Sequence, residues 1–186
     1  MKLKCRSACL KLATTVLLVA ALASLSSGVP AIAGIKLGAP IAKLYVPRFG
    51  KTWARVVYEG TSVAKVLTPL GIGHYSSSAF PGQEGNFALA AHRFASGGAF
   101  LNIDKLRKGD LAFVVTTNQK FTYRFLQSKI VDPQDTWVID PMPPGMTAQP
   151  LTDHLMTFTT CTPVHVNTHR YIAWFEQIGT EKVPTS

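Results

Sequence analysis

Short apolar segments separated by turn-forming residues make up nearly all of the chain after residue 36, and no long amphipathic helical period runs through this part. Such segments, when rich in β-branched and aromatic residues, are typical of β-strands. We expect about eight strands, namely a stretch that ends at Pro47 and the segments 53–58, 87–92, 111–117, 120–130, 132–139, 155–161 and 170–176. The pattern predicts an all-β fold, either a closed or nearly closed barrel or a sandwich.

The segments between the expected strands are loops and turns. Residues 69–86 are rich in glycine, serine and proline and should run irregularly over the surface. One short helical turn is expected within residues 99–110, with Asn102 as a candidate cap and Gly109 as the stop. The prolines within residues 141–150 rule out a helix there.

The first 36 residues have the composition of a membrane-targeting segment. Residues 1–11 carry four positive charges and no acidic residue, and the 24 residues from Leu12 to Ile35 carry no charge. A run of this length can span a bilayer as a signal anchor, whereas Gly28 and Pro30 interrupt it and Ala31-Ile32-Ala33 resembles a signal peptidase site. Under both interpretations the rest of the chain is exported. It is long enough for one domain with its own core.

The formal charge of +9 does not indicate a nucleic-acid-binding protein. Four of the 19 basic residues belong to the targeting segment, which leaves 15 basic residues against 10 acidic residues in the rest of the chain. They are spread along the sequence without a cluster, a distribution that also suits an anionic cell envelope. We therefore expect no nucleic-acid partner.

Cys161 is the only cysteine after position 9, so the exported part of the chain cannot form an internal disulfide. Its thiol could be a small buried hydrophobe, a metal ligand or a nucleophile. A nucleophile needs a nearby base or cation, because an unperturbed thiol is only a few per cent thiolate at neutral pH. His92 and Arg170 are the candidates, since each lies at the end of an expected strand, as Cys161 does.

These three side chains would suit acyl transfer if their strand ends meet. Cys161 would attack a carbonyl carbon, His92 as imidazolium would protonate the leaving amine, and Arg170 would hold the carbonyl or stabilise the oxyanion. Spacing in the sequence does not by itself establish that they meet.

A metal site is the competing interpretation of the same cysteine. Cys161, His165 and His169 are spaced by four residues, which on a helix would place three zinc ligands on one face. Pro163 argues against such a helix. We therefore expect no metal at this position.

Two further side chains are assigned structural roles from the sequence. His74 lies in the expected irregular segment, and we predict a structural hydrogen bond for it. Arg93 follows His92 and points to the opposite face of the strand, so we interpret it as a surface charge.

Several motifs together resemble those of the sortases, the cell-surface cysteine transpeptidases of mainly Gram-positive bacteria. TFTTC at 157–161 is similar to the family's Thr-Leu-x-Thr-Cys signature, FALAAHR supplies the family's histidine at His92, and Arg170 stands where the essential arginine follows the cysteine. The stretches YVPRFG, GIGHYSSSAFPGQEGNFALAAHR and FLNIDKLRKGD resemble class E in particular, with class F a near neighbour. Phe158 replaces the usual leucine and should affect packing, because it points away from Cys161.

The resemblance implies a fold and a set of site residues. The fold would be the eight-stranded sortase-type β-barrel with short helices, with residues 1–36 as signal anchor or signal peptide and 37–186 as the catalytic domain. His92, Cys161 and Arg170 would be catalytic, and Thr160 would help to bind substrate or complete the oxyanion hole. The resemblance implies no cofactor and no metal.

The resemblance also implies a reaction and partners. The enzyme would cleave a C-terminal sorting signal, Leu-Ala-x-Thr-Gly or Leu-Pro-x-Thr-Gly, between threonine and glycine, and join the secreted protein to an amine of a peptidoglycan precursor or a pilin lysine. It would act at the outer face of the cell membrane, or as a secreted protein if residues 1–33 are removed. Two alternatives remain: an L,D-transpeptidase, whose Ser-x-Gly-Cys pattern is absent around Cys161, and a non-catalytic envelope module with an inert thiol.

Overall fold

The computed structural model describes residues 34–144 and 153–184. The expected targeting segment lies almost entirely outside the described residues. Within the described residues, no helix is long and apolar enough to cross a membrane.

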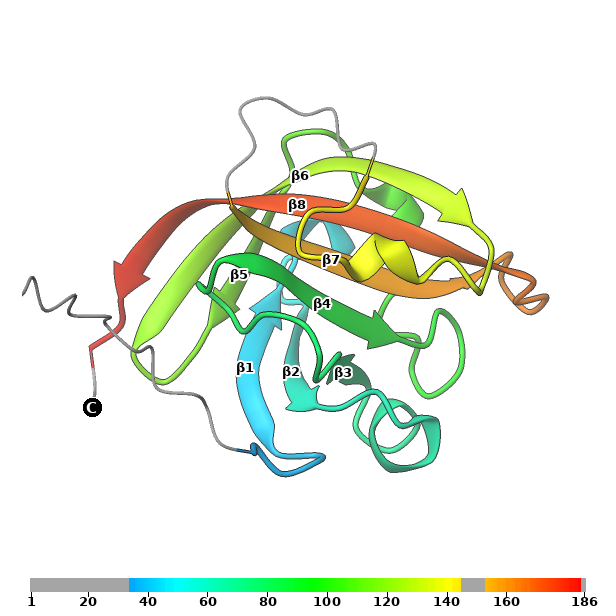
Figure 1. Ribbon diagram of the computed structural model, residues 1–186, viewed down its shortest axis with the longest axis horizontal. Coiled ribbons are helices and arrows are strands. Elements are labelled where there is room, and N and C mark those ends of the chain that lie inside the picture. Colours follow the sequence, from blue (N-terminus) through cyan, green and yellow to red (C-terminus); the bar gives the residue numbers. More distant parts are fainter. Residues whose placement is uncertain (1–33, 145–152, 185–186) are drawn as a thin grey trace, which may run out of the picture. The chain divides into compact units, whose positions relative to one another are not determined.

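Eight strands and four single helical turns make up the described chain (Figure 1). The strands are β1 (Pro40–Tyr45), β2 (Ala54–Glu59), β3 (Ile72–His74), β4 (Gly85–Ala91), β5 (Leu111–Val115), β6 (Gln119–Val131), β7 (His154–Thr162) and β8 (His169–Lys182). The helical turns are η1 (Pro47–Phe49), η2 (Val63–Leu67), η3 (Ile103–Lys105) and η4 (Thr136–Ile139). The predicted all-β class is confirmed.

The strands form one closed barrel in the order β1-β2-β3-β4-β7-β8-β6-β5. Neighbouring strands are antiparallel except for the parallel pairs β2–β3 and β4–β7. Closure leaves no open sheet edge, which removes a common route to aggregation. Figure 1 shows β4, β7 and β8 side by side, and these three strands carry the candidate site.

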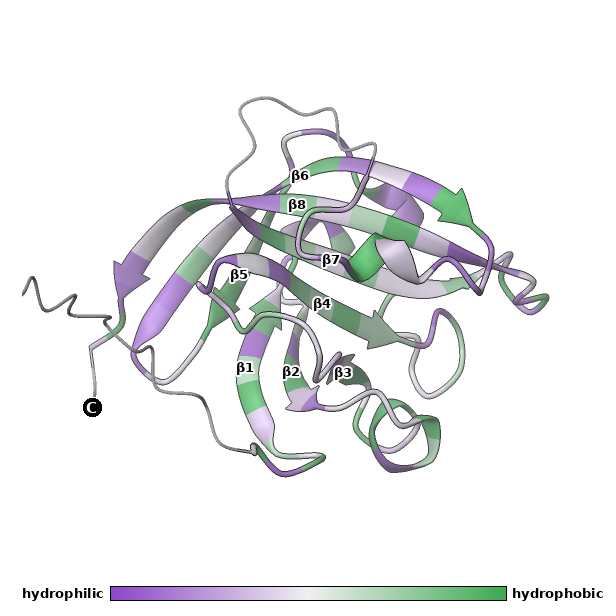
Figure 2. Cartoon of the chain, viewed as in Figure 1, coloured by the Kyte–Doolittle hydropathy of each residue, from purple (hydrophilic) through white to green (hydrophobic). Residues whose placement is uncertain are grey.

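The barrel interior is filled by inward-facing apolar residues of the strands. Figure 2 shows hydrophobic positions along β4 and β7. Phe87 and Leu89 of β4 and Phe158 of β7 belong to this core. Phe158 is fully buried, with its ring 4.6 Å from the rings of both Phe100 and Phe175. The prediction that residue 158 serves packing is confirmed.

The segment 132–139 was expected as a strand and is instead a loop that contains η4, so this prediction is wrong. Its apolar side chains cover the outer face of β8, where the ring of Trp137 stacks on that of Trp174 at 6.1 Å. The Trp174 indole Nε1 donates a hydrogen bond to the Val138 carbonyl oxygen at 3.0 Å. The apolar residues therefore pack as a single turn and do not pair as a strand.

β3 lies inside the segment 69–86, which the sequence predicted as irregular. It has only three residues and pairs with β2 in parallel and with β4 antiparallel. Gly73 at its centre allows this close packing, because a Cβ there would lie 2.2 Å from the Gly60 carbonyl oxygen. A strand this short and glycine-containing has no alternating apolar pattern to reveal it.

The predicted helical turn within residues 99–110 is confirmed as η3. Asn102 makes no capping hydrogen bond. Its side-chain amide instead donates to the Phe49 carbonyl oxygen at 3.3 Å, which joins the loop after β4 to the loop after β1.

Tyr123 of β6 is 1% exposed inside the barrel. Its hydroxyl oxygen accepts a hydrogen bond from the Gly82 N–H at 3.4 Å. Burial strongly raises the pKa of the phenol, and the Gly82 hydrogen bond offsets this only in part. Tyr123 is therefore a neutral core residue at physiological pH.

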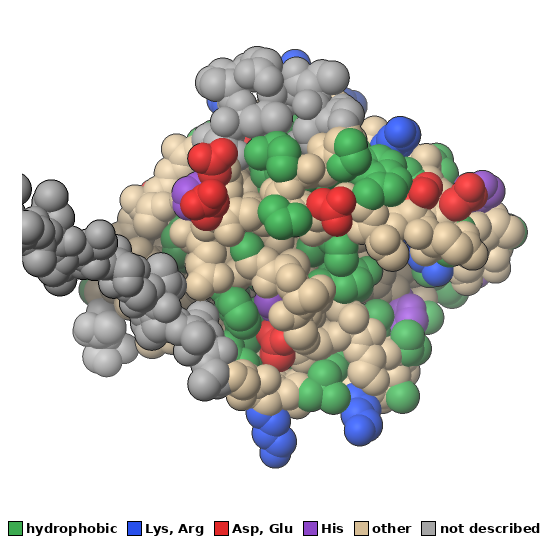
Figure 3. Space-filling model, viewed as in Figure 1, with side chains coloured by type: hydrophobic (Ala, Val, Ile, Leu, Met, Phe, Trp, Pro, Cys, Tyr) green, Lys and Arg blue, Asp and Glu red, His purple; other side chains and the backbone are tan. Residues whose placement is uncertain are grey.

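Charged groups are distributed over the surface. On the face drawn in Figure 3, lysine and arginine side chains do not gather into a continuous patch. Arg48 and Asp110 form a two-point ion pair, with both nitrogen–oxygen distances at 2.7 Å. The hydrogen bonds from Arg48 hold the pKa of the Asp110 carboxyl below its usual range.

Candidate active site

Three strand ends meet on one side of the barrel. β7 and β8 pair so that Cys161 lies directly opposite Arg170. β4 and β7 pair in parallel with Ala90 beside Thr159, and His92 and Cys161 each follow this pair by two residues. The chain therefore brings the imidazole, the thiol and the guanidinium, which the sequence singled out, to neighbouring strand ends.

Strand alternation places these three side chains outside the barrel. Leu89 and Ala91 face the core, so Ala90 and His92 face outward, as predicted. In β7 the inward residue is Phe158, which leaves Thr159 and Cys161 on the outer face. The site is thus a surface groove and not a cavity within the barrel.

The groove has a volume of about 250 Å³. His92, Cys161 and Arg170 all line it. Its remaining walls come from the loop before β3, from Tyr75 and from the strands beneath, with Thr61, Val63, Leu67, Ala90, Ala91, Thr159 and Thr160 as lining residues.

Cys161 and His92 are both partly exposed to solvent in this groove. The thiol of Cys161 is free. The Nε2 atom of His92 is 3.2 Å from the hydroxyl oxygen of Thr68, which follows η2. Sequence reasoning missed Thr68, because an isolated threonine in a loop carries no motif.

The guanidinium of Arg170 is held at the loop between β7 and β8. Its Nη1 atom donates to the carbonyl oxygens of His169 at 3.1 Å and Asn167 at 3.4 Å. Both hydrogen bonds use a single nitrogen of a side chain that carries five N–H donors. This arrangement fixes the side chain while leaving donor capacity for an oxygen ligand in the groove.

Thr160 lies between the groove and the barrel interior and is 3% exposed. Its hydroxyl donates to the Ala91 carbonyl oxygen at 2.7 Å. This bond ties β7 to the last residue of β4, directly before His92. A substrate-binding role for Thr160 stays a prediction. Its hydrogen bond to Ala91 holds together β4 and β7, the strands next to His92 and Cys161.

Arg93 is buried, so its interpretation as a surface charge is wrong. Alternation correctly predicts that it points to the opposite face from His92. On that face, at the end of the barrel where β4 ends, the Arg93 guanidinium contacts Thr162 and Asp104.

Cys161, His165 and His169 do not share a helix. Cys161 belongs to β7, His165 lies in the loop and His169 begins β8. The His165 ring packs 4.0 Å from that of Phe94, and His169 Nε2 is 3.7 Å from Asp132. Residues 34–144 and 153–184 contain no group of three or more histidine, cysteine or acidic side chains placed to hold a metal ion.

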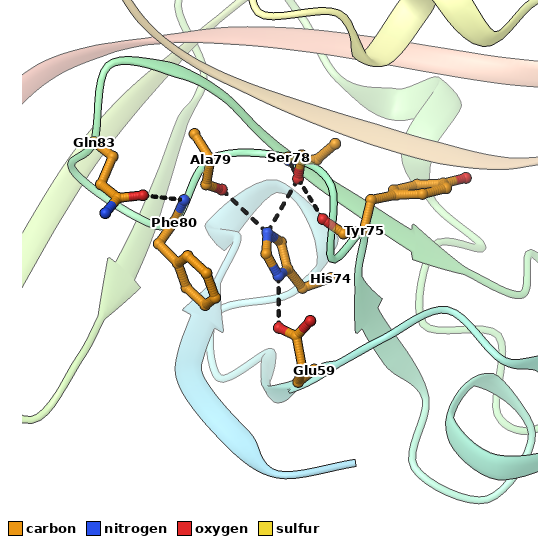
Figure 4. A network of polar contacts seen from close by, with 8 residues as sticks. Glu59, His74, Tyr75, Ser78, Ala79, Phe80 and Gln83 are labelled. Carbon is orange, nitrogen blue, oxygen red and sulfur yellow. Dashed lines mark hydrogen bonds and ion pairs between the residues drawn. The ribbon is translucent and has the colours of Figure 1, made fainter. Parts of the chain in front are cut away.

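His74 is fully buried in β3 and makes the predicted structural hydrogen bonds (Figure 4). Its Nδ1 lies 2.8 Å from the Glu59 carboxylate, and its Nε2 lies 3.0 Å from the Ser78 hydroxyl and 3.1 Å from the Ala79 carbonyl oxygen. These contacts hold the start of the loop after β3. Tyr75 in this loop reaches the groove, where its hydroxyl is 3.0 Å from that of Thr159.

An eight-stranded barrel with a free thiol, an imidazole and a guanidinium at three neighbouring strand ends defines a cysteine acyl-transferase type of site. A family profile described as "Sortase domain" matches residues 44–178. The chain therefore belongs to the sortase family, whose members are cysteine transpeptidases.

The relatives confirm the resemblance to class E. Sortase SrtE2 of Streptomyces coelicolor is 33% identical over 135 residues, which cover 69% of this chain and 52% of that protein. The structure of sortase E from Streptomyces avermitilis is 37% identical with a TM-score of 0.71, over 80% of this chain and 94% of that one. SrtF sortase from Corynebacterium diphtheriae is 26% identical with a TM-score of 0.73, over 82% and 91%.

The chain spans about half the length of the curated relative SrtE2. In contrast, it covers nearly all of the solved sortase E chain. The likeness therefore concerns the barrel that carries the groove.

Proposed function

We propose that this chain is an exported cysteine transpeptidase that cleaves a C-terminal sorting signal and transfers the resulting acyl group to an amine. One observation carries the proposal: His92, Cys161 and Arg170 lie at neighbouring strand ends and line one groove. Membership of the sortase family supports the same reaction class.

In the first step the Cys161 sulfur, as thiolate, attacks the threonine carbonyl carbon of the sorting signal. A bond forms between sulfur and carbon, and Arg170 stabilises the oxyanion. The bond between the threonine carbon and the glycine nitrogen then breaks, and His92 as imidazolium gives its proton to the leaving amine. The product is a thioester on Cys161.

In the second step an amine attacks this thioester. His92 as neutral base takes the proton of the incoming amine, the new amide forms, and the Cys161 thiolate leaves. The amine belongs to a peptidoglycan precursor or to a pilin lysine. No step needs a metal or an organic cofactor.

The protonation states required of this pair predict slow turnover. The pair must be imidazolium and thiolate at the same time, and raising the pH forms the thiolate while it removes the imidazolium, so the active pair is a minor species. We therefore expect a bell-shaped dependence of rate on pH. A rate that stays flat from pH 6 to 10 would contradict this.

The substrates are secreted proteins that end in Leu-Ala-x-Thr-Gly or Leu-Pro-x-Thr-Gly. The site of action is the outer face of the membrane, with residues 1–36 as anchor, or the extracellular space if residues 1–33 are removed. The uncharged run from Leu12 to Ile35 supports export.

The test uses fluorescent peptides with each of the two signals, an amine acceptor, and the purified protein beside Cys161→Ala. Cleavage after threonine and acceptor transfer that vanish in Cys161→Ala support the proposal. Arg170→Ala should lower kcat by about 10²–10³-fold, as loss of one oxyanion donor does. The matched control Arg55→Ala removes an exposed arginine of β2 and should keep wild-type activity.

Mass spectrometry of the protein with either peptide gives the deciding measurement. An acyl adduct on Cys161 is expected. Its absence with both peptides would refute the transpeptidase and favour the non-catalytic envelope module. Transfer onto a wall stem peptide without cleavage of either sorting signal would instead support an L,D-transpeptidase.

A further inference from the structure

We infer that Arg93 is a positioning residue. Its buried guanidinium holds the strand ends that carry His92, Cys161 and Arg170 in place, from the side of the strands that faces away from the groove. The inference rests on the proposed function, because it concerns the geometry of that catalytic site. It assigns a role to a side chain that does not line the groove.

Arg93 is one of three residues that each directly follow a candidate catalytic residue in the sequence. It follows His92 after β4, as Thr162 follows Cys161 in β7 and Tyr171 follows Arg170 in β8. Alternation turns these three next residues away from the groove, toward the barrel end. Because β7 and β8 are antiparallel, Thr162 and Tyr171 lie on either side of the pair of catalytic candidates on these strands. The Arg93 guanidinium contacts both.

The Arg93 guanidinium contacts one residue of β7 and one residue of β8. Nη1 donates to the Thr162 hydroxyl oxygen at 2.8 Å, in a pair where both residues are buried. The guanidinium carbon lies 5.5 Å from the centre of the Tyr171 ring, within the range of a cation–π contact. One planar group thus joins the ends of β4, β7 and β8.

The loop after β4 is tied to the same group. Nη2 of Arg93 is 3.1 Å from the Asp104 carboxylate of η3. The Phe100 N–H donates to the His92 carbonyl oxygen at 3.3 Å, so the loop also returns to the backbone of His92. The backbone on which the imidazole stands is therefore fixed from the loop side and from the barrel side.

The ion pair between Arg93 and Asp104 is unequally buried. The Arg93 side chain is 8% exposed, whereas that of its acidic partner Asp104 is 53% exposed and largely solvated. The positive charge of Arg93 is therefore only partly neutralised by its acidic partner. The contacts with Thr162 and Tyr171 place this charge on the strands that carry Cys161 and Arg170.

Only arginine suits these contacts. Its planar fork can bond Thr162 and Asp104 through separate nitrogens while one face lies over Tyr171. A lysine would keep the charge but could not hold all three partners with a compact ammonium group. A small displacement of a reacting group can cost about 10²-fold in rate, so the loss should appear in kcat.

The test compares Arg93→Met and Arg93→Lys with wild type in the full chain. Arg93→Met should fold, because the acidic partner left behind is mostly solvated. We expect kcat for the sorting-signal peptide to fall about 10–100-fold in Arg93→Met, with KM changed less than about twofold because the groove walls are intact. The kcat of Arg93→Lys should be less than about a tenth of the wild-type kcat, because lysine keeps the charge but not the planar fork.

A matched control separates positioning from stability. Arg124→Met removes a different ion-paired arginine, one on β6 whose partner is the buried Glu176 of β8. It should lower the melting temperature at least as much as Arg93→Met, yet keep the wild-type kcat. Equal losses of kcat in both variants would show that general destabilisation is the cause and would overturn the inference.

A double-mutant cycle tests the route of action. If Arg93 acts through Thr162, kcat of Arg93→Met/Thr162→Val should be no lower than that of the worse single variant. Multiplicative losses would contradict the shared route. Full activity of Arg93→Lys would likewise overturn positioning by the planar fork.

A readout without substrate keeps the inference distinct from the proposed function. Alkylation of Cys161 by iodoacetamide at pH 7 should be about threefold or more slower in Arg93→Met than in wild type, because the strand ends that bring Cys161 to His92 and Arg170 are displaced. If wild type cleaves no sorting-signal peptide but this difference appears, the proposed substrate is wrong and the positioning role stands. If wild type cleaves the peptide and Arg93→Met matches it in both assays, the function stands and the role of Arg93 is refuted.

Discussion

Replacing Phe158 by leucine, the residue usual at this position in the family that the motif resembles, should weaken the barrel without impairing the chemistry. Phe158 makes two aromatic pairs, with Phe100 and Phe175, both with ring centres 4.6 Å apart. Each pair contributes about 0.5–1.5 kcal/mol beyond its buried area, so their loss costs about 1–3 kcal/mol. Leucine still buries most of the apolar surface, and we expect a net loss of about 2 kcal/mol.

Urea unfolding of the purified protein measures this loss directly. A thermal melt should show a fall of about 4–8 °C, because 1 kcal/mol corresponds to about 2–4 °C in a domain of this size. kcat/KM should change less than about threefold at a temperature where both proteins are folded, since residue 158 faces the core.

The control is Phe94→Leu, the same substitution at a side chain that is 56% exposed. It should change the unfolding free energy by less than about 0.5 kcal/mol. A loss below about 0.5 kcal/mol in Phe158→Leu would refute the packing argument. A tenfold fall in kcat/KM with unchanged stability would show that residue 158 acts on the chemistry.

Two further changes test the fold. Gly73→Ala should abolish or severely weaken folding, by about 3 kcal/mol or more, because its Cβ would lie 2.2 Å from the Gly60 carbonyl oxygen; soluble yield and circular dichroism check this, and a wild-type melt would contradict it. Tyr123 has a raised pKa through burial, so its stabilisation is complete below about pH 10 and is lost as the pH rises further. Tyr123→Phe should flatten this alkaline loss in urea titrations, and an unchanged slope would argue against a buried phenol.

The sequence predicted the all-β class and the main strands because short apolar segments alternate with turn-forming residues, whereas the barrel followed only from the family resemblance. It missed β3, whose three residues include Gly73 and whose pairing depends on distant strands. It predicted a strand at 132–139, because a run such as Trp137 and Val138 looks alike whether it pairs as a strand or covers one.

The candidate site was predictable where chemistry restricts residue type. A thiol, an imidazole and an arginine at strand ends form a recognisable set, and the pairing of Cys161 with Arg170 brings two of them together. Arg93 was misinterpreted although its direction was predicted correctly. An inward-pointing arginine at a strand end is either solvated or buried against polar partners. Here the partners are Asp104 and Thr162, whose proximity to Arg93 the local sequence does not reveal.

The strand order has a consequence for how the site arises during synthesis. β1 to β4 form one contiguous half of the barrel and β5 to β8 the other, and strand pairing joins the two halves along β4–β7 and β1–β5. His92 comes from the first half and Cys161 from the second, and the seam between them links residues 69 positions apart. Closing such a loop costs about 4 kcal/mol of chain entropy before any contact offsets it. A nascent chain therefore presents its histidine long before its cysteine, and the thiol meets the imidazole only when β7 has paired with β4.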